Sequence, residues 1–178
     1  MDILGGGKMK ILSIDGSTKS SGWSVFEDGK LIDYGCITSS STDMIKRIQI
    51  MIKGLSQVLT NHNIKTIVLE EVRPENGLQN IKTHKALMYL QAAIAFLVHE
   101  NFPSTDIEYL YPNEWRSKCG IKTGAGVRRS SLKPLDIKFV KETYGLDVND
   151  DIADAIGIGH AYIYENSEPE IIDGFEFK

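Results

Sequence analysis

The alternation of apolar and polar residues divides the chain into short strands followed by longer helices. Three apolar runs near the start, over residues 10–15, 23–27 and 30–38, predict an antiparallel meander. Asp28-Gly29, between the last two runs, is typical of a tight hairpin turn. The first run is the most apolar of the three, which favours a position at the centre of a sheet.

Helix and strand patterns alternate along the rest of the chain. Apolar residues at helical spacing predict a helix capped by Thr42 and ending near His62, and a second amphipathic helix over residues 80–100. The remaining expected elements are strands over 66–72 and 107–110, a small helix from 112, a helix over 133–144, and a last helix from Asn149 or Asp150 to about Tyr164. Residues 119–131 are glycine-rich and basic, which predicts a mobile loop. This order predicts an α/β fold with a mixed five-stranded sheet flanked by helices.

Length and composition predict one domain without membrane segments. The chain has 178 residues, enough for one core, and we expect the domain to cover residues 9–165. Three glycines before Met9 suggest that residues 1–8 are leader or added residues, and residues 166–178 form an acidic tail. No signal peptide or bilayer-length apolar stretch is visible, and two cysteines at unrelated positions favour reduced thiols in the cytoplasm.

Four acidic residues adjoin apolar segments at three places. Asp15 and Glu70 end predicted strands, so they would project from one edge of the sheet if those strands are neighbours. Asp151 and Asp154 share a face in the first turn of the last helix. Converging carboxylates repel one another unless cations lie between them, and oxygen ligands suit Mg²⁺ or Mn²⁺. The alternatives are ordinary turn or helix-end acids, and a register shift of one residue would replace Glu70 by Glu71.

Positive charge gathers in one segment although the net charge is −4. This pattern indicates an anion-binding face, for which the phosphate backbone of nucleic acid is the obvious partner, whereas the alternative is a solvated helix and loop surface. The basic residues in the segment are Arg116, Lys118, Lys122, Arg128, Arg129, Lys133, Lys138 and Lys141.

Three segments resemble the acidic motifs of RuvC-type Holliday junction resolvases. They cover residues 11–17, 67–72 and 151–158, and their order and spacing also match. The resemblance extends from about residue 10 to residue 162, and the variant looks closest to the resolvases of bacteriophages and prophages. The helix motif Asp-x-x-Asp-Ala-Ile, which starts at Asp151, is the most specific of the three.

The resemblance implies an RNase H-like fold and a metal-dependent, structure-selective endonuclease that cuts Holliday junctions and other branched DNA as a homodimer. Asp15, Glu70, Asp151 and Asp154 would hold two Mg²⁺ or Mn²⁺ ions per active site. Lys133 matches the family's catalytic lysine and Arg116 a second basic position. Arg73 stands where bacterial resolvases carry an aromatic residue, so it joins Arg116, Lys118, Lys122, Arg128, Arg129 and Lys133 as a DNA-binding candidate, and base stacking there is not expected. The helix over 80–100 is a candidate dimer interface, although its apolar face could equally be core.

Rival functions of three kinds are open: another nuclease, an ATPase or sugar kinase, and a non-catalytic DNA-binding module. A related RNase H-like nuclease would cut RNA–DNA hybrids, whereas a proofreading exonuclease would need an acid where Ser17 stands. Residues 15–18 also resemble the phosphate loop of actin-like ATPases and sugar kinases, which need two such domains. A non-catalytic DNA-binding module is the third, and the intact acidic motifs argue against it. A resolvase would act in the cytoplasm of a bacterium or of a phage-infected host.

Overall fold

A mixed five-stranded sheet forms the centre of the molecule. The computed structural model describes residues 9–72, 81–124, 127 and 129–166. The strands are β1 (Lys10–Asp15), β2 (Ser20–Glu27), β3 (Lys30–Thr38), β4 (Thr66–Glu70) and β5 (Asp106–Leu110). They lie in the order β3-β2-β1-β4-β5, so the most apolar strand is central, as its composition predicts.

The strand register places the first two acids side by side. β1 pairs with β4 in parallel, and Ile14 lies opposite Leu69, so the next residues, Asp15 and Glu70, end neighbouring strands at one edge. β2 pairs antiparallel with both β1 and β3. The turn between β2 and β3 has positive φ angles of 49° at Asp28 and 79° at Gly29, which confirms the tight hairpin turn.

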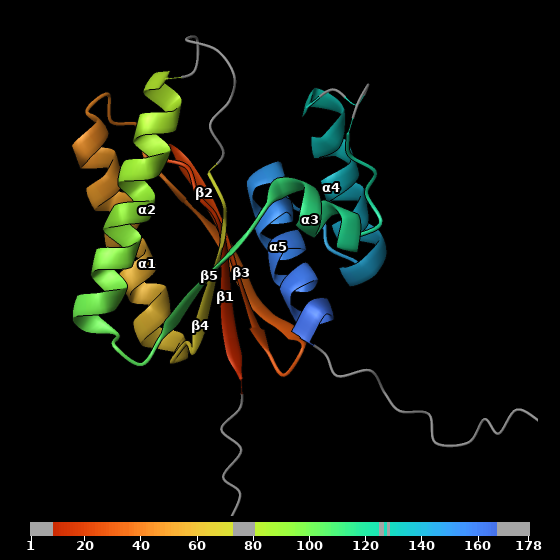
Figure 1. Ribbon diagram of the computed structural model, residues 1–178, viewed down its shortest axis with the longest axis horizontal. Helices are drawn as coiled ribbons and strands as arrows, with labels where there is room; N and C mark the ends of the chain where they lie inside the picture. Colours follow the sequence, from red (N-terminus) through yellow and green to blue (C-terminus); the bar gives the residue numbers. More distant parts are fainter. Residues whose placement is uncertain (1–8, 73–80, 125–126, 128, 167–178) are drawn as a thin grey trace, which may run out of the picture.

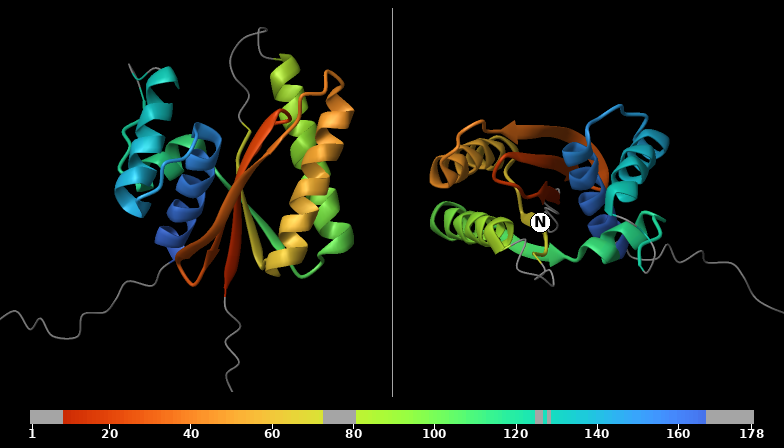
Figure 2. Two further views of the ribbon diagram at one scale, coloured as in Figure 1. Left: turned by 180° about the vertical axis from the view of Figure 1, so that it is seen from behind. Right: turned by 90° about the horizontal axis from the view of Figure 1, so that it is seen from above.

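Helices cover both faces of the sheet. They are α1 (Met44–His62), α2 (Ile81–Asn101), α3 (Pro112–Lys118), α4 (Arg129–Tyr144) and α5 (Asp150–Asn166). Two views agree that α1 and α2 lie on one face, while α3, α4 and α5 lie on the other (Figures 1 and 2). No helix in the described part of the chain is long and apolar enough to cross a membrane.

Helix starts are where the sequence predictions and the structure differ. The cap of α1 is Asp43 rather than Thr42, because the Asp43 carboxylate accepts a hydrogen bond from the Lys46 amide at 3.0 Å. α4 begins at Arg129, four residues before the predicted start at Lys133, so the end of the expected loop over 119–131 is helical. The helix contains Pro134. Pro134 is the sixth residue of α4, so it removes the amide that would donate to the carbonyl of Ser130, and the helix extends upstream of it despite this loss. Asn149 does cap α5, since its side chain accepts from the Ile152 amide at 3.0 Å.

Alternate residues of β1 and β4 pack against the two helical layers. Leu12, Ile14 and Leu69 lie in the core with α1 and α2. Ile11 and Val68 pack on the other face against residues of α3 and α5. Since Asp15 follows Ile11 by four residues and Glu70 follows Val68 by two, both acids face the α5 side of the sheet.

The predicted domain bounds, residues 9 and 165, stay a prediction. Asn166 still belongs to α5, whereas residues 1–8 and 167–178, most of the expected leader and tail, lie outside the described part.

Candidate active site

A single cleft brings the four predicted acids together. Its volume is about 850 Å³, and it opens between the edge of the sheet, α2 and the first turns of α4 and α5. The charged residues that line it are Asp15, Glu70, Glu71, Arg116, Lys133, Asp151 and Asp154. Residues from the start, the middle and the end of the chain therefore face one shared space.

A close contact between β2 and α5 positions the aspartates of the last helix. A side chain at Gly22 would place its Cβ 1.8 Å from the Asp151 carbonyl oxygen, so only glycine allows α5 to lie this near the sheet. The Ser20 hydroxyl, two residues earlier, donates a hydrogen bond to Asp151 Oδ2. Ser20 is thus part of the site, which its sequence context did not reveal.

The site holds more negative charge than its own residues neutralise. Burial, together with the nearby carboxylates of Glu70 and Asp151, raises the pKa of Asp15 to about 8. Burial and the charge of Asp15 raise the pKa of Asp154 to about 9. Asp154 Oδ1 is buried and has no hydrogen-bond partner within the described residues. A divalent cation would supply the missing partner and the missing charge, so the oxygen donors fit such an ion.

The acids face the cleft without closing on one point. No three His, Cys, Asp or Glu residues in the described ranges are already grouped as a metal-ligand set. One protein cation, Arg116, contacts two of the acids instead, Glu70 and Asp154.

Arg116 is the principal cation of the site. Its side chain is buried, and its Nε and Nη2 atoms bond Asp136 Oδ2 at 3.1 and 3.0 Å. Nη2 also donates to Asp154 Oδ2 at 3.2 Å, and Nη1 lies 3.9 Å from Glu70 Oε2. Within the described residues, the charge of Arg116 is thus already paired with carboxylates of the protein itself. Its contact with DNA stays a prediction.

Asp136 is a buried partner of the site that the sequence did not indicate. It is 1% exposed, and it lies on α4 among lysines whose pattern indicated an anion-binding face, with a solvated helix surface as the alternative. Its pairing with Arg116 is a contact between α4 and α3, so only the tertiary structure reveals it.

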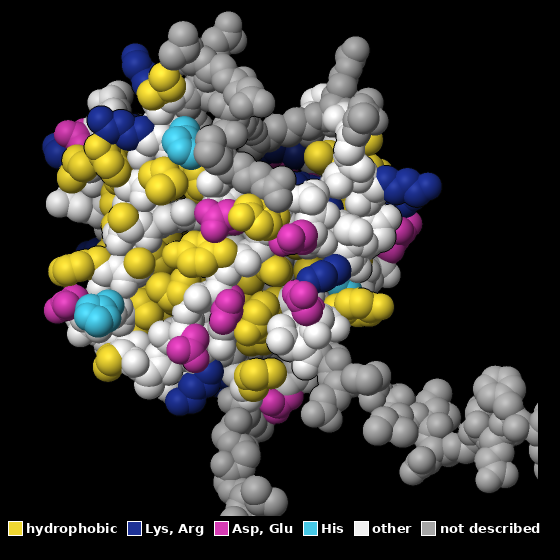
Figure 3. Space-filling model, in the orientation of Figure 1, with side chains coloured by type: hydrophobic (Ala, Val, Ile, Leu, Met, Phe, Trp, Pro, Cys, Tyr) yellow, Lys and Arg dark blue, Asp and Glu magenta, His cyan; other side chains and the backbone are white. Residues whose placement is uncertain are grey.

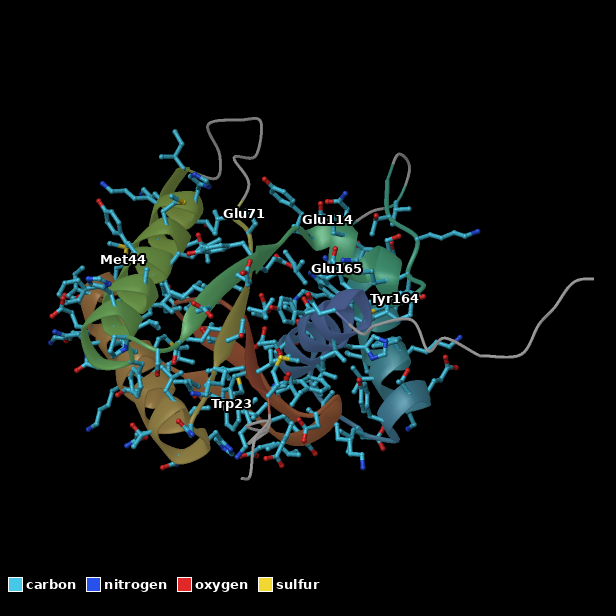
Figure 4. The ribbon with its side chains drawn as sticks, turned by 60° about the horizontal axis from the view of Figure 1, so that its bottom comes forward. Trp23, Met44, Glu71, Glu114, Tyr164 and Glu165 are labelled. Carbon is cyan, nitrogen blue, oxygen red and sulfur yellow. The ribbon has the colours of Figure 1, made fainter. Side chains whose placement is uncertain are left out.

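Glu70 is held on several sides. Trp115 Nε1 donates to Glu70 Oε2 at 2.8 Å, and Gln91 on α2 donates to the Glu70 carbonyl at 2.9 Å. Trp115 is fully buried, as expected of a core residue, but it also positions this acid. Glu71, labelled in Figure 4 where β4 ends, also lines the cleft, but it comes one residue after Glu70, and alternation along the strand turns it from the face that Glu70 shares with Asp15. The register thus favours Glu70 as the ligand.

The predicted basic residues occupy different places. Lys133 lines the cleft and forms an ion pair with Asp150, a hydrogen-bonded contact that raises the pKa of the lysine. Lys118 pairs with Glu165, which is labelled in Figure 4 and lies at the end of α5 away from Asp151 and Asp154. Lys122 is exposed outside the cleft. Arg73 and Arg128 lie outside the described residues, as does the side chain of Arg129.

The raised pKa values predict how pH affects the metal-free protein. With a pKa of about 8 against an ordinary 3.8, folded Asp15 binds a proton that the unfolded chain has released. Stability should therefore fall as pH rises through this window and level off above it. We expect the Tm in EDTA to fall between about pH 5 and about pH 8, and to fall less steeply for Asp15→Asn. Thermal scans of both proteins measure this, and equal slopes would contradict it.

The chain matches one family of known proteins. The profile described as crossover junction endodeoxyribonuclease RuvC matches residues 11–108, which include Asp15 and Glu70. A relative of that name from Dictyoglomus thermophilum is 26% identical over 162 residues, covering 88% of this chain and 98% of the relative. Another from Aliarcobacter butzleri is 29% identical, covering 86% and 98%. Asp151 and Asp154 lie beyond the profile match, so their place in the site depends on the geometry.

Solved structures with the same fold are also resolvases. RuvC of T. thermophilus, in complex with a Holliday junction substrate, has a TM-score of 0.67 at 14% identity, with 88% of this chain and 93% of that chain covered. The yeast mitochondrial Holliday junction resolvase Ydc2 has a TM-score of 0.60 at 16% identity, with 88% and 78% covered. These likenesses confirm the predicted RNase H-like fold.

Proposed function

The chain belongs to the RuvC family of crossover junction endodeoxyribonucleases, and from this membership we infer that it is a structure-selective endonuclease acting on Holliday junctions. The observation that carries the proposal for this site is the convergence of Asp15, Glu70, Asp151 and Asp154 on one cleft. The further likeness to phage resolvases stays a prediction, as does a cytoplasmic location beside the DNA substrate.

We assign Asp15, Glu70, Asp151 and Asp154 as the ligands of the divalent ions on which nucleases of this kind depend. Bound there, Mg²⁺ or Mn²⁺ ions would lower the pKa of a water molecule and stabilise the leaving oxygen of the phosphodiester. Trp115 and Ser20 fix one oxygen each of Glu70 and Asp151 by hydrogen bonds, so these side chains need little reordering when the ions arrive.

Lys133 supplies positive charge for the substrate phosphate, whereas Arg116 orients one of the acids. The ammonium of Lys133 is half exposed at the cleft, so it can exchange Asp150 for a phosphate oxygen. Arg116 keeps Asp154 Oδ2 occupied and leaves Oδ1 for an ion. In this arrangement Asp136 balances the charge of Arg116, so that the arginine does not replace the metal.

The proposed function is tested by comparing substrates. We expect cleavage of a synthetic four-way junction in Mg²⁺ or Mn²⁺, weaker cleavage of linear duplex, and none in EDTA, because paired sites suit a branched substrate. Denaturing gels of end-labelled strands measure the products. An RNA–DNA hybrid serves as the comparison, and its preferential cleavage would favour the rival RNase H-like activity.

An apolar face on α2 supports assembly as a homodimer. Ile81, Met88, Tyr89 and Phe96 are between 43% and 68% exposed, and their spacing of seven or eight residues puts them along one stripe. Figure 3 shows hydrophobic side chains over α2 and on toward the edge strand β5, where Tyr109 is also exposed. We propose that two copies pair through this face, which would present two equivalent active sites to a four-way junction.

The dimer predicts the mass of the protein in solution. Light scattering should give twice the 19.8 kDa of the chain, and Phe96→Glu should give the mass of a monomer, because the charge would be buried at the interface. Ile45→Glu on α1, also exposed, is the matched control and should remain dimeric. A monomer for the unmodified chain, with and without junction DNA, would remove this assembly.

A further inference from the structure

A second cavity, of about 420 Å³, lies next to the turn between β1 and β2. We call it the hydroxyl pocket, and its lining residues are Lys19, Ser39, Ser40, Ser41, Thr42 and Arg47. The lining residues carry four hydroxyl groups and two cations, and none of them is acidic; the hydroxyls of Ser39 and Ser41 also accept hydrogen bonds from the amides of Ser41 and Asp43. The lining therefore has the chemistry of an anion site.

Arg47 is held in place by neutral groups. Its Nε donates to Thr18 Oγ1 at 3.2 Å, and its Nη1 donates to the carbonyl oxygens of Ser41 and Thr42 at 3.1 and 3.0 Å. Thr18 is buried, so the guanidinium is fixed on one side by the protein interior. Nη2 has no hydrogen-bond acceptor among the described residues, which leaves a preorganised donor at the pocket.

Neither cation forms an ion pair within the described residues. No ion pair joins Lys19 or Arg47 to a carboxylate there, whereas Lys133 and Arg116 in the active site are both paired. Asp43, the acid nearest to Arg47 along the chain, caps α1 through the Lys46 amide and is not part of the lining, although the charge of Arg47 helps to lower its pKa. Two cations without an ion pair, beside hydroxyl groups, favour a ligand with strong acceptor oxygens.

The hydroxyl pocket lies close to the metal-binding acids. Lys19 follows Asp15 by four residues, which span at most about 14 Å when extended. Ser20, the next residue, donates its hydroxyl to Asp151. A nucleic-acid strand advances about 3.4 Å per nucleotide, so the pocket is within about four nucleotides of the cleavage point.

We propose that the hydroxyl pocket binds a backbone phosphate of the DNA strand that is cut, a few nucleotides from the scissile phosphodiester. The inference rests on the proposed function, because it takes the strand to pass through the active-site cleft. Lys19 and Arg47 contribute the charge, and the hydroxyls of residues 39–42 bind the remaining phosphate oxygens. A second fixed phosphate holds the strand in register while the reacting phosphodiester is positioned at the acids.

The experiment combines single-phosphate neutralisation with a charge deletion. Each junction carries a single methylphosphonate linkage, which removes the charge of one phosphate. The linkage is placed in turn at each of four positions on either side of the cut, and the affinity of each junction is measured for the unmodified chain and for Lys19→Met. We expect one position at which the neutral linkage lowers the affinity of the unmodified chain several-fold. At that position the linkage should not lower the affinity of Lys19→Met any further. The salt dependence of binding should also become shallower by about 0.7–0.9 in log–log slope for Lys19→Met, the value for one phosphate contact.

Lys53→Met is the matched control, because Lys53 is an exposed lysine of α1 outside the hydroxyl pocket. Arg47→Lys is a second test, because it keeps the positive charge but removes the fixed guanidinium donor. This variant should bind junction DNA more weakly, and the loss should map to the same linkage as that of Lys19→Met. The pocket proposal is overturned if Lys19→Met binds like Lys53→Met, or if the losses of affinity from Lys19→Met and from the neutral linkage add at every position. In either case the nuclease assignment stands. If the unmodified chain neither binds nor cuts junctions, the proposed function itself fails. Inorganic phosphate is titrated alone as well, and saturation at micromolar concentration would assign the pocket to the free ion instead.

Discussion

Replacing Asp154 by Asn is expected to lower junction cleavage by a factor on the order of a thousand or more, because metal-ion catalysis supplies several kcal/mol to such reactions. The substitution keeps the shape of the side chain and an acceptor for Arg116, but it removes the charge beside the buried, unpaired Oδ1. Binding of the junction should be retained, since the phosphate contacts that we propose involve other residues. Single-turnover cleavage and equilibrium binding of the same labelled junction measure the two effects.

Glu142→Gln is the matched control for this variant. Glu142 is an exposed acid of α4 that pairs with Lys138, away from the cleft, and its replacement should leave cleavage unchanged. If Asp154→Asn cuts junctions at the rate of the unmodified chain, Asp154 is not a ligand and the site consists of the other three acids.

Replacing Asp136 by Asn is expected to be the most destabilising of the single substitutions proposed for this chain. Asp136 is buried and bonds two nitrogen atoms of Arg116, and removing one partner of a buried ion pair typically costs about 3–5 kcal/mol. For a chain of this size each kcal/mol lowers the Tm by about 2–4 °C, so the fall should be on the order of 10 °C. Thermal unfolding in EDTA measures it.

The same variant should respond less to metal. Without Asp136, the charge of Arg116 is left to Asp154 and Glu70, and it competes there with a divalent cation. The rise in Tm on adding Mg²⁺ should therefore be smaller for Asp136→Asn than for the unmodified chain. Asp147→Asn, which removes an exposed partner of Lys141, is the control and should cost at most about 1 kcal/mol. Equal Tm values for Asp136→Asn and this control would mean that the buried pair has no structural role.

The fold and the acidic residues were accessible from sequence because each has a local signature. β1 is a continuous apolar run that ends in Asp15, and Asp151 and Asp154 share a helical face, so pattern alone placed these acids at the ends of elements. The positions of the strands fixed which residues would be neighbours, and the parallel pairing of β1 with β4 joined Asp15 to Glu70.

The supporting residues had no such signature. Ser20 and Asp151 are separated by 131 positions, and Arg116 and Asp136 by 20, so neither contact follows from spacing within one element. Arg116 has the same charge as the neighbouring lysines, and only its burial shows that it pairs with the carboxylates of the site. Tertiary packing decides whether a basic residue faces solvent or the protein interior, and a single sequence does not contain that choice.

The contact between Gly22 on β2 and the start of α5 makes the site depend on both ends of the chain. A growing polypeptide still attached to the ribosome carries Asp15 and Glu70 long before residues 151 and 154 have been made. With the proposed ligand set, a nascent chain cannot complete its metal site until residue 154 has been made and the final helix has docked.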